Sequence, residues 1–529
     1  MVKHVLLYTA QAWGHTKPLV SLMILIAESH SDVVFTFITN VMYPKIIAEL
    51  GKLPKERYEK VQGQIHVIHI HNPTMGPFAY PGLIDAIRRL YRCEYLTCAT
   101  SGRTTTGLPK PCLAIIDPFV TFAIDAICQI RASPKELPIF CWMSSPVGAM
   151  IRAFGPQYLG GRGDITVEVD KLVSETGRDR AEVAIEVFSN VKGEVVTMPG
   201  YPPMFDYEWF QQEVDLGMTT HFLRAGRESI HKAEGTLFVT ASVIEREAIE
   251  AMKEYFWGMG KRLVPVGLVS SMMMPDVQVS SDTDDEVVVT FLDKIYKEQG
   301  EKSLFYVSFG SVWWPKDATK VYAVIDELIQ RRTPFILGHG SPRANVPEEV
   351  KSKIAVSGIG LEVKWAPQET ILRHPATGWF ITHGGWNSVQ EGLQYKVPLI
   401  FWPMSGDQPM NASLMTLKHR AGFQLISVRT GKHTKRPYRC DYEPSFSVEA
   451  VREEFRLMVE KCRGEDGRMV RANFEQLREA VLHLWDIEGG EARVEIEEFL
   501  KATDVIVRRF DEASSFKVWS GLRSVFVLT

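Results

Sequence analysis

The 529-residue chain lacks the features that mark secreted, zinc-binding or nucleic-acid-binding proteins. Its seven cysteines are an odd number, and none forms the Cys-x-x-Cys spacing of zinc sites and redox dithiols, so we expect reduced thiols in a reducing compartment. Lys and Arg number 60 against 64 Asp and Glu, and a net charge of −4 leaves no basic excess to neutralise the phosphates of DNA or RNA. Nucleic acid is therefore not an expected partner.

Long apolar runs are also missing. No stretch approaches the roughly 18 consecutive uncharged apolar residues that a membrane-spanning helix needs. Residues 1–29 contain two apolar runs, but a polar, turn-forming stretch at residues 11–18 separates them, and no small-residue cleavage site follows a continuous apolar core as in a signal peptide. We therefore expect a cytoplasmic protein with no membrane span.

Two parts of the chain begin with the same pattern of buried strand, glycine-containing turn and amphipathic helix. Residues 4–8 open the first part and residues 303–309 open the second, as a parallel strand does when it leads into a crossover helix. Further short strands are expected at residues 33–38, 65–70, 113–116, 139–142 and 237–240. This alternation predicts an α/β protein with two doubly wound, Rossmann-like domains.

The predicted boundary between the domains is a polar, acidic and aperiodic stretch, which is typical of a linker. We expect a first domain at residues 1–269, the linker at 270–287 and a second domain at 288–500. Residues 501–529 combine helical patterning with an apolar end, and we expect them to cross back to the first domain.

The segment from Trp365 to Gln408 carries the strongest chemical signal. It predicts a buried strand at residues 378–382, a His-Gly-Gly turn that lets backbone approach a ligand, and a helix that begins at Asn387 and Ser388. Such a helix start presents free N–H groups and the positive end of the helix dipole. It is suited to a diphosphate and needs no metal ion.

Other side chains of this segment suit the rest of a nucleotide. Trp365 offers a flat face for a base, and Glu391 lies one turn beyond Ser388, where its carboxylate can accept two vicinal ribose hydroxyls. Ser388-x-x-Glu391 is also the pattern of a helix capping box, which alone would account for both residues. The combination with a closing Asp407-Gln408 pair favours a ligand site over a purely structural role.

The segment resembles the signature box of the UDP-dependent glycosyltransferases of the inverting, GT-B-fold superfamily that glycosylate small molecules. The motifs WAPQ, HxGWNS, the following Glu, the Val-Pro pair and the closing Asp-Gln pair are all in register. GHTKP, IIDPF, EGTLFVTASVIE, VPVGLV and YVSFGS resemble the family more loosely. Gly384, where plant members usually carry Cys, and Lys396, where a Gly is common, are departures. The resemblance implies a GT-B architecture with the active site in the cleft between the domains.

The resemblance also implies how the nucleotide is bound. Trp365 stacks on the uracil, Gln368 helps to hold the nucleoside, and Glu391 binds the ribose. The diphosphate is held by Ser311, His383, Asn387 and Ser388. The co-substrate is then a UDP-sugar, with no further cofactor and no metal.

For the sugar, the resemblance implies that Asp407 and Gln408 bind hydroxyls and that Trp386 shapes the donor pocket. Ser144 or Ser145 falls near the family's sugar-contacting hydroxyl. In this family a closing Gln tends to accompany glucose, and the segment has no Arg placed to pair with a uronic acid. UDP-glucose is therefore the expected donor.

His15 is the candidate general base. A lone His near a helix start is more often structural, but this one follows the first strand of an open α/β sheet, where ligands bind. The positive end of the helix disfavours the protonated imidazolium, whereas a nearby carboxylate such as Asp117 favours the imidazolium and orients the ring. Because these two effects oppose each other, the ring can stay a neutral base near working pH. The resemblance assigns the same roles to His15 and Asp117, while Asp125 is the competing candidate for the carboxylate.

Two other motifs resemble metal sites. Asp282-Thr283-Asp284 matches a metal-binding DxD motif but lies in the predicted linker, where acidic runs are usually solvated. His66, His69 and His71 suggest a metal cluster, but strand alternation places His66 and His69 on opposite faces, so a shared ion is not expected. We expect neither motif to bind metal.

The expected activity is inverting transfer of a sugar from a UDP-sugar to a hydroxyl of a small lipophilic acceptor, giving a β-glycoside and UDP. A nucleotide-sugar epimerase on the same architecture and a non-catalytic UDP-sugar-binding protein are the alternatives. The His15 and Asp117 pair counts against a binding protein. The acceptor is expected to contact residues 72–80, 142–152 and 200–212, and the aromatic side chains in two of these segments indicate an apolar molecule; they are Phe78, Tyr80, Phe205, Tyr207 and Trp209.

Overall fold

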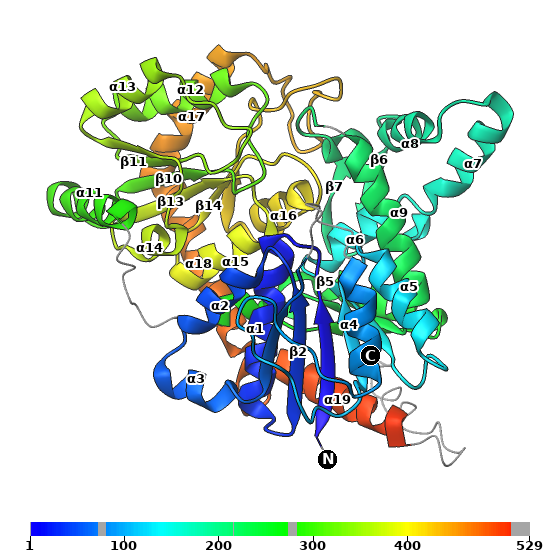
Figure 1. Ribbon diagram of the computed structural model, residues 1–529. Helices are drawn as coiled ribbons and strands as arrows, with labels where there is room; N and C mark the ends of the chain where they lie inside the picture. Colours follow the sequence, from blue (N-terminus) through cyan, green and yellow to red (C-terminus); the bar gives the residue numbers. More distant parts are fainter. Residues whose placement is uncertain (1, 72–80, 215, 273–282, 509–529) are drawn as a thin grey trace, which may run out of the picture.

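The computed structural model describes residues 2–71, 81–214, 216–272 and 283–508, which form two α/β halves, each built on a parallel sheet (Figure 1). The first sheet has seven strands in the order β3-β2-β1-β4-β5-β8-β9. Their bounds are β1 Lys3–Tyr8, β2 Val33–Thr39, β3 Ile65–His69, β4 Leu113–Ile116, β5 Ile139–Met143, β8 Gly235–Phe238 and β9 Arg262–Pro265. The strand order reverses between β1 and β4, and such a switch point opens a crevice at the carboxyl ends of the strands.

The second sheet has six parallel strands in the order β12-β11-β10-β13-β14-β15. Their bounds are β10 Leu304–Ser308, β11 Phe335–Gly338, β12 Gly360–Val363, β13 Thr377–Thr382, β14 Leu399–Phe401 and β15 Gly422–Gln424. Its switch point lies between β10 and β13, where Val307 pairs with Ile381. Two doubly wound Rossmann-like sheets, as expected from the alternating pattern, make up the GT-B architecture.

Helices cover both faces of each sheet (Figure 1). In the first half they are α1 Trp13–Ser29, α2 Tyr43–Gly51, α3 Lys55–Val61, α4 Pro81–Tyr91, α5 Thr121–Ile130, α6 Val147–Phe154, α7 Ile165–Thr176, α8 Arg180–Ser189, α9 Leu216–Lys232 and α10 Ser242–Gly258. In the second they are α11 Thr283–Gln299, α12 Ala318–Gln330, α13 Glu348–Ser357, α14 Gln368–Arg373, α15 Trp386–Tyr395, α16 Gln408–Ser413, α17 Val448–Arg463 and α18 Glu465–Leu482. Helices α7 and α8 project from the first half near a small antiparallel hairpin of β6 Val195–Met198 and β7 Tyr201–Phe205.

The last described helix, α19 Glu491–Arg508, lies against the first sheet. Phe499 packs edge-on against Phe140 of β5 with the ring centres 4.8 Å apart, and the Trp485 indole donates to the Val266 carbonyl at 3.0 Å. The chain therefore returns to the first half before residue 501, and residues 509–529 lie outside the described residues. In the expected linker, α11 already begins at Thr283, and residues 273–282 also lie outside the described part.

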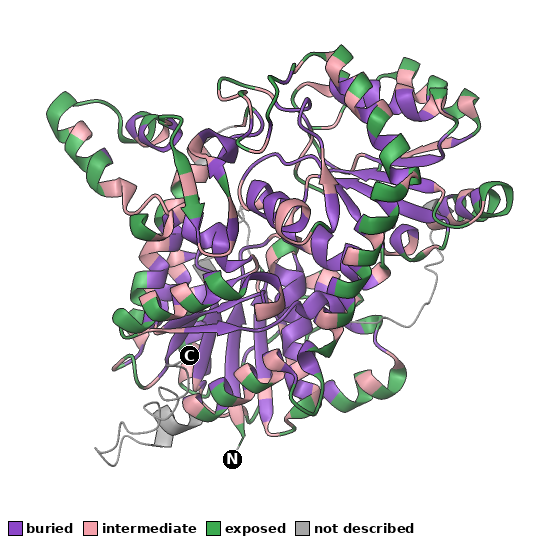
Figure 2. Cartoon of the chain, turned by 180° about the vertical axis from the view of Figure 1, so that it is seen from behind, coloured by how far each residue is buried: buried purple, intermediate pink, exposed green. Residues whose placement is uncertain are grey.

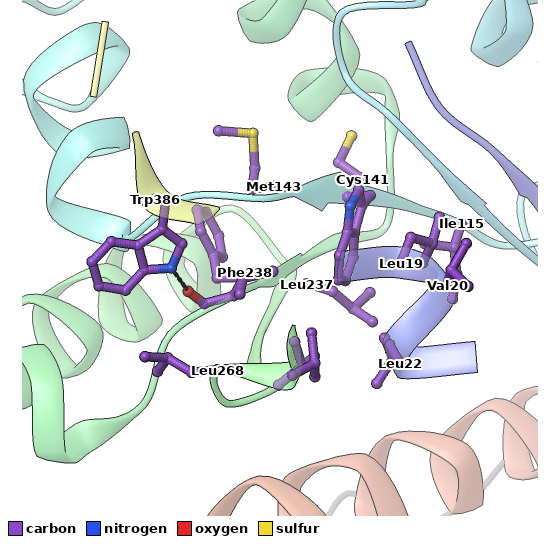
Figure 3. Packing of buried hydrophobic residues seen from close by; sticks show 14 of the residues in the cluster. Leu19, Val20, Leu22, Ile115, Cys141, Met143, Leu237, Phe238, Leu268 and Trp386 are labelled. Carbon is purple, nitrogen blue, oxygen red and sulfur yellow. Dashed lines mark hydrogen bonds between the residues drawn. The ribbon is translucent and has the colours of Figure 1, made fainter. Parts of the chain in front are cut away.

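The central strands of both sheets are buried, and the exposed residues gather on the outer helices (Figure 2). One continuous apolar cluster joins the two halves, because it includes Phe238 of the first sheet, Phe380 of the second and Trp386 of α15. Figure 3 shows Trp386 beside Phe238 and Leu268, with its indole N–H donating to the Val239 carbonyl at 2.7 Å. Across the described residues, every helix is too short or too polar to span a membrane.

Candidate active site

The carboxyl ends of both sheets meet at a cleft between the halves. Helix α1 follows β1 and touches the second half directly, because the Asn387 side-chain amide donates to the Gly14 carbonyl at 3.2 Å. Asp117 follows β4 on the same side of the cleft, and His383 follows β13 on the other. The two switch points thus bring the predicted base and the predicted diphosphate-binding residues to one place.

His15 and Asp117 form a short hydrogen bond. His15 lies in the first turn of α1, and its Nδ1 is 2.7 Å from Oδ2 of the fully buried Asp117. The carboxylate is itself fixed by two backbone N–H donors, Ala10 at 3.3 Å and Phe119 at 2.9 Å. With Nδ1 donating its proton to Asp117, Nε2 of a neutral His15 is left as a proton acceptor.

The environment raises the pKa of His15. Burial alone would lower this pKa, but the Asp117 carboxylate outweighs burial through its charge and its hydrogen bond, and Asp407 of the opposite half adds to the effect. Burial raises the pKa of Asp407 in turn, while Asn411 and the facing His15 oppose that rise. The His15 imidazole and the Asp407 carboxylate therefore act on each other across the cleft.

Asp125, the competing carboxylate, is elsewhere. It lies on α5 with its side chain 43% exposed, and its Oδ1 pairs with Lys232 at 2.6 Å. Of the two candidates, the structure brings Asp117 and not Asp125 to His15.

Helix α15 begins at the predicted diphosphate site. Gly385 is its N-cap residue, so Trp386, Asn387 and Ser388 are its first three residues. Ser388 is therefore not a cap residue, and the alternative capping-box interpretation does not apply to this helix. Gly384 has φ +79°, and a Cβ there would lie 2.4 Å from the Phe401 ring, so in this chain a side chain at position 384 would collide with Phe401.

His383 packs between the two glycine turns of the second half. A Cβ added at Gly310 would lie 3.0 Å from its ring, which places the loop containing the exposed Ser311 beside it. Burial lowers the pKa of His383 to about 4, so its imidazole is neutral near neutral pH. A neutral ring can donate one hydrogen bond to a phosphate without carrying charge.

The nucleoside candidates are linked to one another. The Gln368 amide donates to Glu391 and its oxygen accepts from the Tyr306 hydroxyl at 3.2 Å. Trp365 is 57% exposed, and the Lys45 ammonium of α2 lies 5.4 Å from its ring centre. Trp365 is thus more than half exposed, with a cation of the first half over its ring.

The two sugar candidates open α16. The Gln408 oxygen accepts from the backbone N–H groups of Met404 at 2.7 Å and Ser405 at 3.1 Å, which leaves its amide group as a donor. Asp407 accepts from the Asn411 amide at 2.7 Å, and the same amide donates to the Gly384 carbonyl at 3.0 Å. Asn411, one helical turn beyond Asp407, was not identified from the sequence, although its i, i+4 spacing is a detectable signal.

Trp386 and the two serines that follow β5 have less open surroundings. The Trp386 side chain is 2% exposed and its indole is bonded to the first half, so the ring anchors α15 there, and its part in shaping the donor pocket stays a prediction. A buried indole N–H needs an acceptor, and the Val239 carbonyl supplies it. Ser144 and Ser145 are partly buried at the end of β5, and the Ser145 hydroxyl donates to the Pro146 carbonyl at 3.4 Å.

A cavity of about 710 Å³ opens beside Met404, whose backbone N–H donates to Gln408. It lies between residues 212–214 of the first half and the loop that follows Ser311. Trp313, Trp314, Arg343 and Met404 are among its lining residues. Of the segments expected to contact the acceptor, residues 200–212 reach this cavity at Gln212, and residues 72–80 lie outside the described part of the chain.

Comparison with known proteins gives a consistent result. The family described as "UDP-glucoronosyl and UDP-glucosyl transferase" matches residues 272–433. UDP-glycosyltransferase eriJ of Hericium erinaceus is 27% identical over 505 residues, which are 92% of this chain and 96% of that protein. Zeatin O-xylosyltransferase of Phaseolus vulgaris is 27% identical over 388 residues, or 68% of this chain and 78% of that protein.

Solved structures share the fold. UGT2 of Phytolacca americana, in complex with UDP-2fluoro-glucose and pterostilbene, superposes with a TM-score of 0.63 at 18% identity, covering 95% of this chain and 100% of that one. UGT71G1 of Medicago truncatula, in complex with UDP-glucose, gives a TM-score of 0.63 at 17% identity, covering 95% and 98%. The chain is thus similar to UDP-glycosyltransferases, which transfer a sugar from a UDP-sugar to small molecules, over 92% of its length, and it shares the GT-B fold of their solved structures.

Proposed function

We propose that this enzyme transfers glucose from UDP-glucose to a hydroxyl of a small lipophilic acceptor, with inversion at the anomeric carbon. The observation that carries the proposal is the 2.7 Å hydrogen bond between His15 and the buried Asp117, at a cleft whose other wall bears Asp407. A base held on one half can act on an acceptor while the other half holds the donor.

In the proposed reaction, Nε2 of His15 takes the proton of the acceptor hydroxyl as its oxygen attacks the anomeric carbon. The bond between the anomeric carbon and the β-phosphate oxygen breaks, and its electron pair leaves with UDP. Asp117 stabilises the imidazolium that forms, because its charge lies 2.7 Å from Nδ1. Attack from the face opposite the leaving diphosphate gives the β-glycoside.

For the donor, the start of α15 is the proposed diphosphate site, because its first N–H groups have no partners within the helix. Asn387, Ser388, the neutral His383 and the exposed Ser311 surround it as uncharged donors. Trp365 is the proposed platform for the uracil.

For the sugar, Asp407 supplies an acceptor and Gln408 supplies a donor, because the Gln408 oxygen is already bonded to backbone. A donor and an acceptor side by side suit the equatorial hydroxyls of glucose. Xylose, which lacks the exocyclic hydroxymethyl group of glucose, is the competing sugar to be tested, because a zeatin O-xylosyltransferase is among the relatives.

For the acceptor, the cavity of about 710 Å³ supports a small molecule, because its lining offers apolar surface at Trp313, Trp314 and Met404 beside charged groups such as Arg343. The complex of Phytolacca americana UGT2 holds pterostilbene as a small molecule beside its UDP-2fluoro-glucose.

The test is a donor and acceptor screen. The purified enzyme is incubated with UDP-glucose, UDP-galactose, UDP-glucuronate or UDP-xylose, with and without hydroxylated lipophilic compounds, and UDP release is measured. We expect acceptor-dependent UDP release with the highest kcat/KM for UDP-glucose, and a β-linkage by NMR coupling. Interconversion of UDP-sugars without an acceptor would indicate an epimerase, and binding without UDP release would indicate a binding protein.

A further inference from the structure

A lysine of the first half reaches the proposed ribose-binding residue of the second. Lys17 lies in α1, two residues after His15, and is 3% exposed. Its Nζ is 2.7 Å from Oε1 of Glu391 and 2.6 Å from Oε1 of Glu369. No feature of the sequence assigned a role to Lys17, because its partners lie more than 350 residues away.

Lys17 is held in its charged form. Burial alone would lower its pKa, but the carboxylates of Glu391 and Glu369 outweigh burial and raise the pKa well above its usual value. Glu391 is itself 7% exposed, so little water reaches its carboxylate. A buried carboxylate without a paired cation would be strongly destabilised, and Lys17 supplies that cation.

The described contacts of Glu391 leave part of its accepting capacity unused. Its Oε1 accepts from Lys17, and its Oε2 accepts from the Gln368 amide. A carboxylate has about four acceptor positions, two on each oxygen. One position therefore remains on each oxygen, which is the number that two vicinal hydroxyls require.

We propose that Lys17 is a positioning residue for the UDP-sugar, which fixes the charged carboxylate of Glu391 from the opposite half so that it accepts the ribose hydroxyls. This proposal rests on the role of Glu391 in the proposed function. With this role for Lys17, the first half, which carries His15, also contributes to recognition of the nucleotide.

A simple interdomain ion pair is the competing explanation, and Lys52 provides the matched control. Lys52 also belongs to the first half and binds the second, with Nζ 2.8 Å from Glu369 Oε2. It pairs with Glu49 at 2.9 Å and is 42% exposed, but it has no contact with Glu391 among those described. Lys52→Met removes an interdomain ion pair and leaves the Lys17 and Glu391 pair in place.

The experiment compares UDP with 2′-deoxyuridine 5′-diphosphate by isothermal titration calorimetry. In the wild-type enzyme, loss of one hydroxyl bonded to a carboxylate is expected to weaken binding roughly 10- to 100-fold. In Lys17→Met we expect weaker UDP binding. We also expect the ratio of the two dissociation constants, deoxy nucleotide over UDP, to fall to about 3 or less. In Lys52→Met we expect the wild-type ratio, because Glu391 keeps its orientation.

Two more variants complete the test. Lys17→Gln keeps a hydrogen-bond donor without the charge, and it replaces Lys17→Met if that variant does not fold. Lys17→Gln is also expected to lower the ratio of dissociation constants. Lys17→Arg keeps the charge and is expected to retain most of the wild-type ratio. A wild-type ratio in Lys17→Met or Lys17→Gln would overturn the proposal while leaving the UDP site intact. A fall of the ratio in Lys52→Met as large as in Lys17→Met would do the same. Failure of the wild-type enzyme to bind UDP would overturn the proposed function itself.

Discussion

Replacing Asp117 with Asn tests the catalytic pair most directly. Asp117 is fully buried, and its two oxygens accept from three N–H donors, at His15, Ala10 and Phe119. The amide of Asn has nearly the same shape, but it carries no charge and its NH2 group must face one of these donors. The substitution therefore removes the charge next to His15 and breaks at least one hydrogen bond.

The expected loss follows from these contacts. A hydrogen bond to a charged group contributes about 1.5–3 kcal/mol, and a buried donor left without a partner costs about 1–3 kcal/mol. His15 becomes an imidazolium as it takes the proton. The rate therefore changes only by the part of this energy that stabilises the imidazolium more than the neutral ring. We therefore expect an effect of about 2–4 kcal/mol on the transition state, which is roughly a 30- to 1,000-fold decrease in kcat/KM.

The pH profile gives a second, independent measurement. His15 acts as a base only when neutral, so activity is lost as the pH falls through its pKa. Asp117 raises that pKa above its ordinary value of about 6.5, whereas burial alone would lower it. In Asp117→Asn burial remains and the charge is gone, so the acid limb of kcat/KM should move to lower pH although the maximum falls.

Asp125→Asn is the control, because it removes a surface ion pair with Lys232 that contributes at most about 1 kcal/mol to stability. It should leave both the rate and the acid limb unchanged. An Asp117→Asn enzyme with near wild-type kcat/KM, or with an acid limb at the wild-type pH or above it, would refute the roles assigned to Asp117 and His15.

Three further outcomes are expected. His15→Ala should keep UDP binding, measured by calorimetry, and lose roughly 100- to 10,000-fold in transfer, since it removes a general base; normal turnover would exclude that role. Gln408→Glu keeps the oxygen that holds Met404 and removes the donor, so kcat/KM for UDP-glucose should fall about 10-fold or more; unchanged donor kinetics would contradict the sugar contact. Activity should survive exhaustive chelation by EDTA, because uncharged donors and a helix start hold the diphosphate; loss of activity that manganese restores would point to Asp282-Thr283-Asp284.

The sequence predicted what depends on short stretches of chain. His15, Asp117 and His383 each follow a buried strand, and the strand pattern alone indicates that they lie at the carboxyl edge of a sheet. The choice of Asp117 over Asp125 also agrees with the geometry, although the roles of both residues stay predictions. A fold of two parallel sheets followed from the same local pattern.

What the sequence did not predict depends on how the two halves dock. Lys17 and Glu391 are neighbours only because α1 and α15 face each other across the cleft. The direction of the Trp386 ring is set by an acceptor at Val239, 147 residues away. Glu391 and Ser388 fitted a capping box equally well until the structure showed that Gly385 is the N-cap residue. Periodicity within one segment carries no information about such contacts.

The anchoring of α15 constrains how this enzyme can be recombined with its relatives. The helix belongs to the donor half by sequence, yet Trp386 bonds to Val239, and Gln390 bonds to the backbone N–H of Ser270 at 3.1 Å and to the Ser271 hydroxyl at 2.8 Å. A chimaera joined within residues 273–282 would pair a foreign α15 with these native partners. Exchange of donor specificity by swapping halves should therefore succeed only when the residues that receive α15 are exchanged with it.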